Sequence, residues 1–375
     1  MNILFLTHYD NMYGANRAMY KLIKELRKEM PDADITLAIP AEGEMTKAVS
    51  ELDVHFFISG GTQWQAFYST PLRFMIKKVM RRKLIKMESD NLYEEFKDKH
   101  IDVIHSNSSV TNLGALLAKR LGCKHIWHIR EFSYEHFNMR YFYNPKFVMT
   151  LYEKSDYLIT ISDSLKENIQ KKYPKANVVR VYDGVSGEYD KAKGMGEGKF
   201  RFVYVGYLFS MKKQLEVLEA VKILKDRGIY NFEVDIVGDG DNDYKKSLYE
   251  YKEKYRLDNV KLLGYVDDIH SLLDKSDAGI IASRYEGFGL VTVEYMLHSL
   301  PVIGYNGGGT GEIIINNETG FLYYDVDELA GKMEMLINDK DLAKRLGDNG
   351  RLRAKEQFSE ELNAKELIKI YKNLS

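Results

Sequence analysis

One turn in the second half of the chain reads Ser283-Arg-Tyr-Glu286-Gly-Phe-Gly-Leu-Val-Thr-Val-Glu294, after an apolar run typical of a strand and at the start of a helical pattern. Gly287 and Gly289 carry no side chain, so backbone N–H groups can approach a phosphate at the helix N-terminus, where the dipole also favours an anion. We expect Glu294 to lie about two turns inside the helix, roughly 12 Å from Glu286, comparable to the span from a sugar to a ribose across a diphosphate. Carboxylates bind vicinal hydroxyls well because they accept two hydrogen bonds. A lone pair of glutamates is more often a solvated surface feature, but the glycines and the next segment favour a binding site.

A second glycine-rich turn reads Pro301-Val-Ile-Gly-Tyr-Asn-Gly-Gly-Gly309-Thr-Gly-Glu312, and we expect a helix to begin near Glu312. Consecutive glycines can form an anion-binding nest of backbone N–H groups. A flexible surface loop is the alternative. Two glycine-rich helix starts within one α/β domain favour phosphate binding.

Basic residues follow an earlier strand, in Val203-Tyr-Val-Gly206-Tyr-Leu-Phe-Ser-Met-Lys212-Lys213. A lysine beside such a turn can stabilise the negative charge that develops on a departing diphosphate. A Lys-Lys pair by itself is more often a solvated helix start, so this segment carries weight only beside the two glycine-rich turns.

Short runs rich in isoleucine and valine alternate with amphipathic stretches along the whole chain, which predicts parallel sheets covered by helices on both faces. The predicted strands are 2–7, 35–39, 103–105, 125–128, 157–161, 202–205, 232–237, 260–263, 278–282, 301–303 and 320–322, and the predicted helices are 15–29, 113–121, 164–172, 214–225, 244–255 and 360–374. A length of 375 residues suits two domains. We predict two Rossmann-like doubly wound domains, 1–190 and 197–357, that face each other across a cleft. Segment 191–199 links them, and helix 358–375 packs back on the first.

Composition narrows the function and the compartment. The chain has 54 Lys and Arg against 55 Asp and Glu, a balance that disfavours a dedicated nucleic-acid binder. Cys123 stands alone and cannot form an internal disulfide, which favours a reducing compartment. No export signal is recognisable at the N-terminus, and no apolar window is long enough to span a bilayer. We therefore expect a cytoplasmic protein, with contact at the inner face of the cell membrane left open.

Segment 72–87 predicts a basic amphipathic helix. It holds seven basic residues and no acidic one, and its apolar residues share a helical face. Such a helix can lie on an anionic membrane. The alternative is an ordinary helix packed on the first domain with its lysines in water.

Two histidines end predicted strands of the first half. His105 has no second ligand at close spacing, so we interpret it as structural. His128 is followed by Arg130 and Glu131, which puts three polar groups at one strand exit and favours a role in the site. The aromatic residues after it, Tyr134, Phe137, Tyr141, Phe142 and Tyr143, either line an acceptor groove or fill core, and core is the stronger expectation.

No metal site is predicted. Segment 239–250 has much of the spacing of a calcium loop, but Tyr244 stands where that loop needs glycine. We interpret the segment as a strand-to-helix turn with acidic capping.

On these residues the chain resembles the retaining glycosyltransferases of family 4, which have the GT-B fold. Glu286 and Glu294, with seven residues between them, look like the family's E-x7-E signature. Other matching segments in the family's order are Gly206 with Lys212, 237–240, 263–266, 308–312 and 319–322 in the second half, and 101–105, His128, 155–162 and 183–185 in the first.

The resemblance implies that the second domain holds a nucleoside diphosphate sugar, of UDP or GDP type, and the first a glycan or lipid-linked acceptor in cell-surface polysaccharide assembly. It implies hexose transfer that keeps the anomeric configuration and needs neither a metal ion nor another cofactor. Glu286 would contact the sugar hydroxyls and Glu294 the ribose. Lys212 would meet the diphosphate, and His128 would lie near the anomeric carbon. The other donor-binding residues that it implies are Gly14, Gly206, Lys213, Tyr265, Val266, Gly287, Phe288, Gly289, Leu290 and Gly309.

The chain departs from the family pattern at three positions. Tyr207 stands where the family usually has an arginine, so one cationic contact to the diphosphate is missing unless Lys213 or Arg284 substitutes. Tyr13-Gly14 replaces a pair of glycines, and Asp183 replaces an asparagine.

These departures keep two alternatives open. One is a family member that binds nucleotide sugar or a partner chain with weak or no transferase activity, and the other is a nucleotide-sugar epimerase of similar fold. A dinucleotide-dependent dehydrogenase is disfavoured because segment 6–15 lacks the three-glycine fingerprint.

Overall fold

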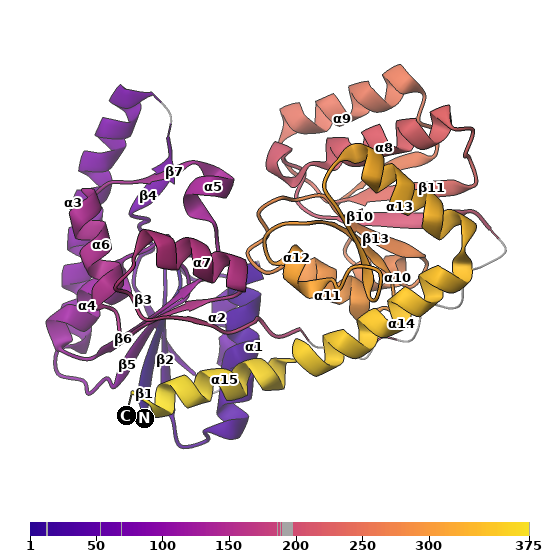
Figure 1. Ribbon diagram of the computed structural model, residues 1–375. Helices are drawn as coiled ribbons and strands as arrows, with labels where there is room; N and C mark the ends of the chain where they lie inside the picture. The colour runs from indigo at the N-terminus through magenta and orange to yellow at the C-terminus, as the bar shows by residue number, and fades with distance from the viewer. Residues whose placement is uncertain are drawn as a thin grey trace. The chain divides into compact units, whose positions relative to one another are not determined.

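The computed structural model describes residues 1–12, 14–52, 54–68, 70–185, 187, 189 and 198–374. The chain forms two compact units, one of Met1–Gly184 with Glu360–Ser375 and the other of Val185–Ser359 (Figure 1). The first unit therefore ends at Gly184 and resumes at Glu360, where we had placed these boundaries at 190 and 358. Most of the predicted linker 191–199, like Tyr13, lies outside the described residues.

The N-terminal unit is built on a seven-stranded parallel sheet in the order β3-β2-β1-β5-β6-β8-β9. Its strands are β1 (Asn2–Leu6), β2 (Asp34–Ile39), β3 (His55–Ile58), β5 (Val103–Ser106), β6 (Lys124–Ile129), β8 (Tyr157–Thr160) and β9 (Val178–Arg180). The same unit contains a separate two-stranded antiparallel ribbon, in which β4 (Gln65–Phe67) pairs with β7 (Met139–Tyr141). Its helices are α1 (Gly14–Glu29), α2 (Glu44–Ser50), α3 (Pro71–Phe96), α4 (Leu113–Leu121), α5 (Ser133–Phe137), α6 (Pro145–Lys154), α7 (Asp163–Lys172) and α15 (Glu360–Lys372).

The last helix, α15, completes the N-terminal unit, as we predicted for the end of the chain. Figure 1 shows α15 beside α1, and Lys21 of α1 pairs with Glu360 of α15 at 2.7 Å. Ala364, Leu367 and Tyr371 of α15 are fully buried in the core that β1 and β2 share with α1.

The C-terminal unit is built on a six-stranded parallel sheet in the order β12-β11-β10-β13-β14-β15. Its strands are β10 (Phe200–Val205), β11 (Phe232–Val237), β12 (Val260–Gly264), β13 (Ala278–Ile281), β14 (Val302–Tyr305) and β15 (Gly320–Tyr323). Its helices are η1 (Ser210–Lys212, a 3₁₀ turn), α8 (Gln214–Asp226), α9 (Asn242–Tyr255), α10 (Ile269–Leu273), α11 (Leu290–Leu297), α12 (Thr310–Ile313), α13 (Val326–Asn338) and α14 (Lys340–Gln357).

The predicted α/β class and its parallel sheets are confirmed. Strand β13 is buried along its whole length and reads as a continuous apolar run. The unpredicted strands, β3, β4, β7 and β9, have only three or four residues each, and each includes exposed or half-buried residues. Across the described residues, no helix combines the length and apolarity that crossing a bilayer requires.

Candidate functional site

The predicted binding turns all follow strands of the C-terminal sheet, so they meet at its carboxyl edge. Strand order reverses between β10 and β13, which are neighbours in the sheet although β11 and β12 separate them in sequence. Ligands of open parallel sheets bind at such a switch point. The turn after β10 carries Lys212, and the turn after β13 carries Glu286, so these two residues flank the switch point.

Lys212 and Glu286 are in direct contact. Lys212 Nζ donates to Glu286 Oε1 at 2.6 Å, and the side chains are 25% and 19% exposed. The Tyr204 hydroxyl, buried in the core, donates to the Lys212 carbonyl at 2.7 Å and holds the backbone of this lysine in place. The switch point thus presents a cation and a carboxylate side by side, both reachable from solvent.

The two glycine-rich turns are locked together by their backbones. The Gly309 N–H donates to the Glu286 carbonyl at 2.8 Å. A Cβ on Gly308 would lie 2.5 Å from the Glu286 carbonyl oxygen, and one on Gly309 would lie 2.1 Å from the Phe288 carbonyl oxygen. Only glycine allows this approach. The glycines that the sequence offered as phosphate ligands therefore also have a structural task, which is to bring the second turn against Glu286.

Helix α11 begins later than we predicted. Gly289, with φ +111°, precedes its first residue, Leu290. Glu294 is therefore the fifth helical residue, just over one turn inside the helix. The expectation of about two turns is wrong because the chain between Glu286 and Gly289 is not helical. The spacing of roughly 12 Å, which assumed helical rise throughout, stays a prediction.

Three hydroxyl groups near these turns escaped the sequence analysis. The side-chain oxygens of Ser283, Thr292 and Thr310 are buried and have no hydrogen-bond partner among the residues that the structure describes. A Cβ on Gly289 would lie 3.0 Å from Thr292 Oγ1 and 3.3 Å from Thr310 Oγ1, so both threonines lie beside the start of α11. α12, predicted to begin near Glu312, begins at Thr310 and forms a single turn.

The other predicted donor-binding residues of this unit lie on the same edge. Gly206 follows β10, while Tyr265, 75% exposed, and Val266 follow β12. Lys213 has a left-handed backbone with φ +61° between η1 and α8. The Phe288 ring is buried against Phe358 at 5.5 Å between centroids, so a contact from this position to a donor would come from its backbone.

Arg284 has a different task from the one we considered. It donates to both carboxylate oxygens of Glu216, at 3.0 and 2.8 Å, and its guanidinium lies over the Tyr305 ring at 4.1 Å. This bidentate pair already matches its charge. Lys213 is therefore the better substitute for the arginine that Tyr207 replaces.

In the N-terminal unit, Gly14 is the exposed first residue of α1, whereas His128 of β6 is fully buried. Arg130, just past the strand, pairs with Asp183, and both side chains are 5% exposed. Arg130 Nε also donates to Asn107 Oδ1 at 2.9 Å. The family's asparagine is thus replaced by an aspartate that forms a buried ion pair.

The hydrogen bonds around His128 determine its tautomer. An Arg130 guanidinium nitrogen lies 3.4 Å from His128 Nδ1 and can only donate, so Nδ1 is an acceptor and the proton is on Nε2. His105 Nε2 lies 3.2 Å from the same Nδ1, and His105 Nδ1 lies 2.6 Å from the Tyr371 hydroxyl of α15, which is consistent with this assignment. Burial and the Arg130 charge hold the pKa values of both histidines well below the usual range. His128 is therefore neutral, with a proton on Nε2 that meets no acceptor within the described part of the chain.

Two cavities open in the N-terminal unit. One, of about 510 Å³, is lined by Tyr134, Tyr141 and Tyr143 among others, whereas Phe142 is buried. The aromatic segment after His128 therefore divides, with three tyrosines on a cavity and Phe142 in the core. The Phe137 side chain lies outside the described set.

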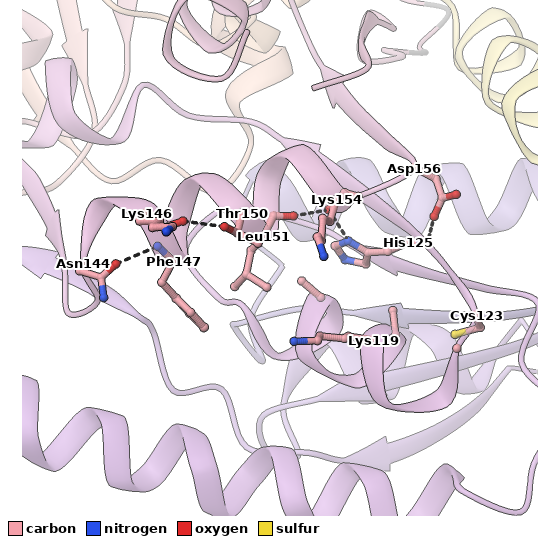
Figure 2. Close-up of a pocket in the computed structure, with 14 residues that line it drawn as sticks. Lys119, Cys123, His125, Asn144, Lys146, Phe147, Thr150, Leu151, Lys154 and Asp156 are labelled. Atoms are coloured by element: carbon pink, nitrogen blue, oxygen red, sulfur yellow. Dashed lines mark hydrogen bonds between the residues drawn. The ribbon is translucent and has the colours of Figure 1, made fainter. Parts of the chain in front are cut away.

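The other cavity, of about 540 Å³, lies between α4 and α6 beside the residues that precede β6 and β8 (Figure 2). It is thus at the amino edge of the sheet, away from His128. Burial raises the pKa of the Cys123 thiol there to about 11, which makes it a poor nucleophile. None of the predicted site residues lines this cavity between α4 and α6.

Metal ligands are scarce in the part of the chain that the structure describes, where no three His, Cys, Asp or Glu side chains are grouped. Asp239 of the calcium-like segment pairs with Lys245, and Asp241 caps α9 by accepting from the Tyr244 N–H at 2.8 Å.

Comparisons with known proteins agree with the motifs. Residues 12–188 match the family model described as Glycosyltransferase Family 4, and residues 185–353 match the one described as Glycosyl transferases group 1. An uncharacterized glycosyltransferase of Methanocaldococcus jannaschii is 32% identical over 73% of this chain and 76% of its own length. The capsular polysaccharide biosynthesis glycosyltransferase CapM of Staphylococcus aureus is 29% identical over 60% of this chain, and the match spans 65% of CapM. The crystal structure of Anabaena HepE in complex with UDP superposes with a TM-score of 0.77 at 20% identity, over all of both chains, which shows a shared fold.

Proposed function

The chain belongs to the family 4 glycosyltransferases of GT-B fold, and on that premise we propose that it moves a hexose from a UDP- or GDP-sugar to a glycan or lipid-linked acceptor with retention of the anomeric configuration. The observation that carries the proposal is the contact of Lys212 with Glu286 at the switch point, beside two interlocked glycine turns. The relative named for capsular polysaccharide biosynthesis supports cell-surface polysaccharide as the setting. A location on the cytoplasmic side of the membrane is part of our proposal. The UDP complex of a structural neighbour supports a nucleotide donor.

The proposed chemistry follows from the charges. The diphosphate of the donor takes over Lys212, which frees the Glu286 carboxylate to accept hydrogen bonds from the sugar hydroxyls. Glycine backbone N–H groups at 289 and 309 add donors to the phosphate oxygens, and Glu294 binds the ribose. Lys212 and these N–H groups stabilise the leaving diphosphate without a metal ion.

The transfer itself breaks the bond between the anomeric carbon and the phosphate oxygen and forms one to the acceptor oxygen on the same face. The acceptor's proton goes to the leaving phosphate. His128, neutral and with its proton on Nε2, is proposed as a hydrogen-bond donor and not as the base.

A thermal-shift panel of UDP- and GDP-sugars tests donor binding, because a ligand at 100 times its Kd adds about 2.7 kcal/mol of stability. A transfer assay with the donor that binds then tests turnover, with the anomeric configuration of the product read by NMR. Glu286→Ala should reduce transfer about a thousandfold or more with unchanged melting temperature, while Glu318→Ala, an exposed glutamate of the same unit, should leave it unchanged.

Each alternative gives its own result. Donor binding without turnover would identify a binding protein, and exchange between sugar epimers without transfer would identify an epimerase. Near-normal transfer by Glu286→Ala would remove Glu286 from the site. Activity should persist in EDTA, and its loss there would contradict the metal-independent mechanism.

A further inference from the structure

Helix α3 has two apolar faces, and the N-terminal unit covers only one. Its inner face carries Ile85, Leu92 and Phe96, which are at most 1% exposed. Near its start, Phe74 packs on Phe142 at 5.3 Å between centroids. These contacts account for how the helix is held on the unit.

The outer face of α3 is apolar and exposed over its first five turns. Leu72 is 72% exposed, Val79 64% and Met80 60%. The full outer stripe is Leu72, Met75, Ile76, Val79, Met80, Leu84 and Met87, at the spacing of one helical face. Figure 1 shows this part of α3 extending past the β4–β7 ribbon of its unit. A contiguous apolar surface of this size on a soluble unit marks an interaction site.

The charge of the side chains around the outer stripe shows which kind of partner it favours, a second copy of the chain or an anionic surface. Its flanks carry Arg73, Lys77, Lys78, Arg81, Arg82, Lys83 and Lys86, and residues 72–87 include no acidic side chain. Seven like charges on one segment of the chain repel a second copy of the same segment and attract an anionic surface. A helix with an apolar stripe between long basic side chains lies in the plane of an anionic bilayer, with the stripe among the acyl chains and the charges at the phosphates.

We propose that the outer stripe of α3 docks this protein on the surface of an anionic lipid bilayer. Every basic side chain near such a surface strengthens binding, so the segment suffices for reversible attachment without a lipid anchor. The attachment does not depend on glycosyl transfer and is measurable without it.

The docked face lies beside the aromatic cavity of the N-terminal unit. Arg82 of α3 lies over the Tyr143 ring at 5.0 Å, and Tyr143 lines the cavity of about 510 Å³. Where the proposed function holds, a lipid-linked acceptor could keep its tail in the bilayer while its glycan reaches this cavity.

Cosedimentation of the full chain with vesicles tests the proposal. Vesicles of phosphatidylcholine with 40% phosphatidylglycerol should retain the protein at least tenfold better than pure phosphatidylcholine at low salt, and retention should fall as salt rises. Ile76→Ser/Val79→Ser/Met80→Ser should reduce retention about tenfold or more. Lys77→Gln/Arg81→Gln/Lys83→Gln should do the same and should abolish the preference for the anionic vesicles.

A matched control has the same change in charge elsewhere on the unit. Lys119→Gln/Lys146→Gln/Lys154→Gln neutralises three exposed lysines around the other cavity (Figure 2) and should retain wild-type binding. All variants change exposed residues, so their melting temperatures should match the wild type.

Three results would overturn the proposal. Equal retention by anionic and neutral vesicles would remove the electrostatic argument. Wild-type retention of both α3 variants would remove the outer stripe as the contact. A dimer that the apolar variant dissociates, with vesicle binding unchanged, would identify a second copy of the chain as the occupant.

Discussion

An ion pair near the carboxyl edge of the parallel sheet can be compared between the two units of this protein, and the two pairs differ in access to solvent. Arg130 and Asp183 of the N-terminal unit are 5% exposed, whereas Lys212 and Glu286 of the C-terminal unit are 25% and 19% exposed. Around the first pair lie neutral buried histidines, and around the second lie glycines. The carboxyl edges of two similar parallel sheets therefore differ in both the exposure of their ion pairs and the residues around them.

The difference indicates a division of tasks. A buried pair with further hydrogen bonds is held in one geometry and supports its neighbours, while an accessible pair can exchange partners with a ligand. We therefore expect changes at the N-terminal edge to act mainly on stability and changes at the C-terminal edge mainly on donor binding and turnover. Four predictions test that division.

The largest expected effect is that of acid on the N-terminal unit. Burial lowers the pKa of His8 and of His125 to about 3, and the pKa values of His105 and His128 lie well below the usual range. Arg130 lowers the last two further, and Asp156 partly opposes the shift of His125. A histidine whose pKa is lowered by folding is neutral in both the folded and the unfolded chain above its unfolded pKa of about 6.5. As the pH falls below that value, the histidine binds a proton in the unfolded chain only, so the free energy of unfolding decreases. Between about pH 7.5 and 5.5 each histidine should lower the free energy of unfolding by on the order of 1 kcal/mol, and the four together by several kcal/mol.

Tryptophan fluorescence during a urea titration can measure the unfolding of the N-terminal unit, because the chain's two tryptophans, Trp64 and Trp127, are both buried there. The fluorescence midpoint should fall steeply from pH 7.5 to 5.5, and the part of the circular dichroism transition that belongs to the C-terminal unit should move less. In that unit His298, whose pKa burial also lowers, pairs with Asp274, which opposes the shift. A fluorescence midpoint independent of pH would contradict the prediction.

The next effect is the loss of the buried pair. Asp183→Ala leaves the Arg130 guanidinium buried without its carboxylate and should lower the free energy of unfolding by about 3–5 kcal/mol. Asp183→Asn, which restores the family residue and keeps an acceptor oxygen, should cost clearly less. Urea titration followed by fluorescence checks both, and Glu286→Ala serves as the contrast because its pair is accessible. Equal destabilisation by Asp183→Ala and Glu286→Ala would erase the distinction between the pairs.

A smaller effect is expected at the glycine contact of the C-terminal unit. Gly309→Ala places a Cβ 2.1 Å from the Phe288 carbonyl oxygen, so the two turns must separate, at a cost of about 1–3 kcal/mol. Gly331→Ala is the control, because nothing lies within 4 Å of the added Cβ in α13, and it should be neutral or slightly stabilising. Thermal unfolding by circular dichroism measures stability, and UDP-sugar thermal shifts measure whether donor binding falls too. Wild-type stability and binding in Gly309→Ala would show that the turns need not touch.

The same contrast explains what the sequence could predict. The glycine-rich turns of the C-terminal unit could be located from the sequence because they depend on glycines at fixed local spacing, and buried parallel strands could be located as apolar runs. That these turns bind phosphate stays a prediction. The N-terminal edge was not, because its partners are remote in sequence: Arg130 and Asp183 are 53 residues apart, and His105 and Tyr371 are 266 apart. Glu294 was misplaced within its helix because backbone at positive φ near Gly289 delays the helix start. The roles of the individual site residues stay predictions.

The smallest expected effect sharpens the comparison at Tyr207, where the C-terminal unit lacks the family's arginine. Tyr207 is 62% exposed, and its carbonyl accepts from Gln214 Nε2 at 3.0 Å, a bond that a new side chain leaves intact. Tyr207→Arg adds a cation beside Lys212 and Lys213, and a solvent-accessible contact to a diphosphate should add up to about 1 kcal/mol, or about fivefold in the Kd of UDP. Calorimetric titration at two salt concentrations checks this, because the gain should shrink as salt rises, and Tyr207→Gln should show none. A gain shared by Tyr207→Gln would mean that tyrosine obstructs the turn, while no gain in Tyr207→Arg would mean that Lys212 and Lys213 already supply the charge that this turn requires.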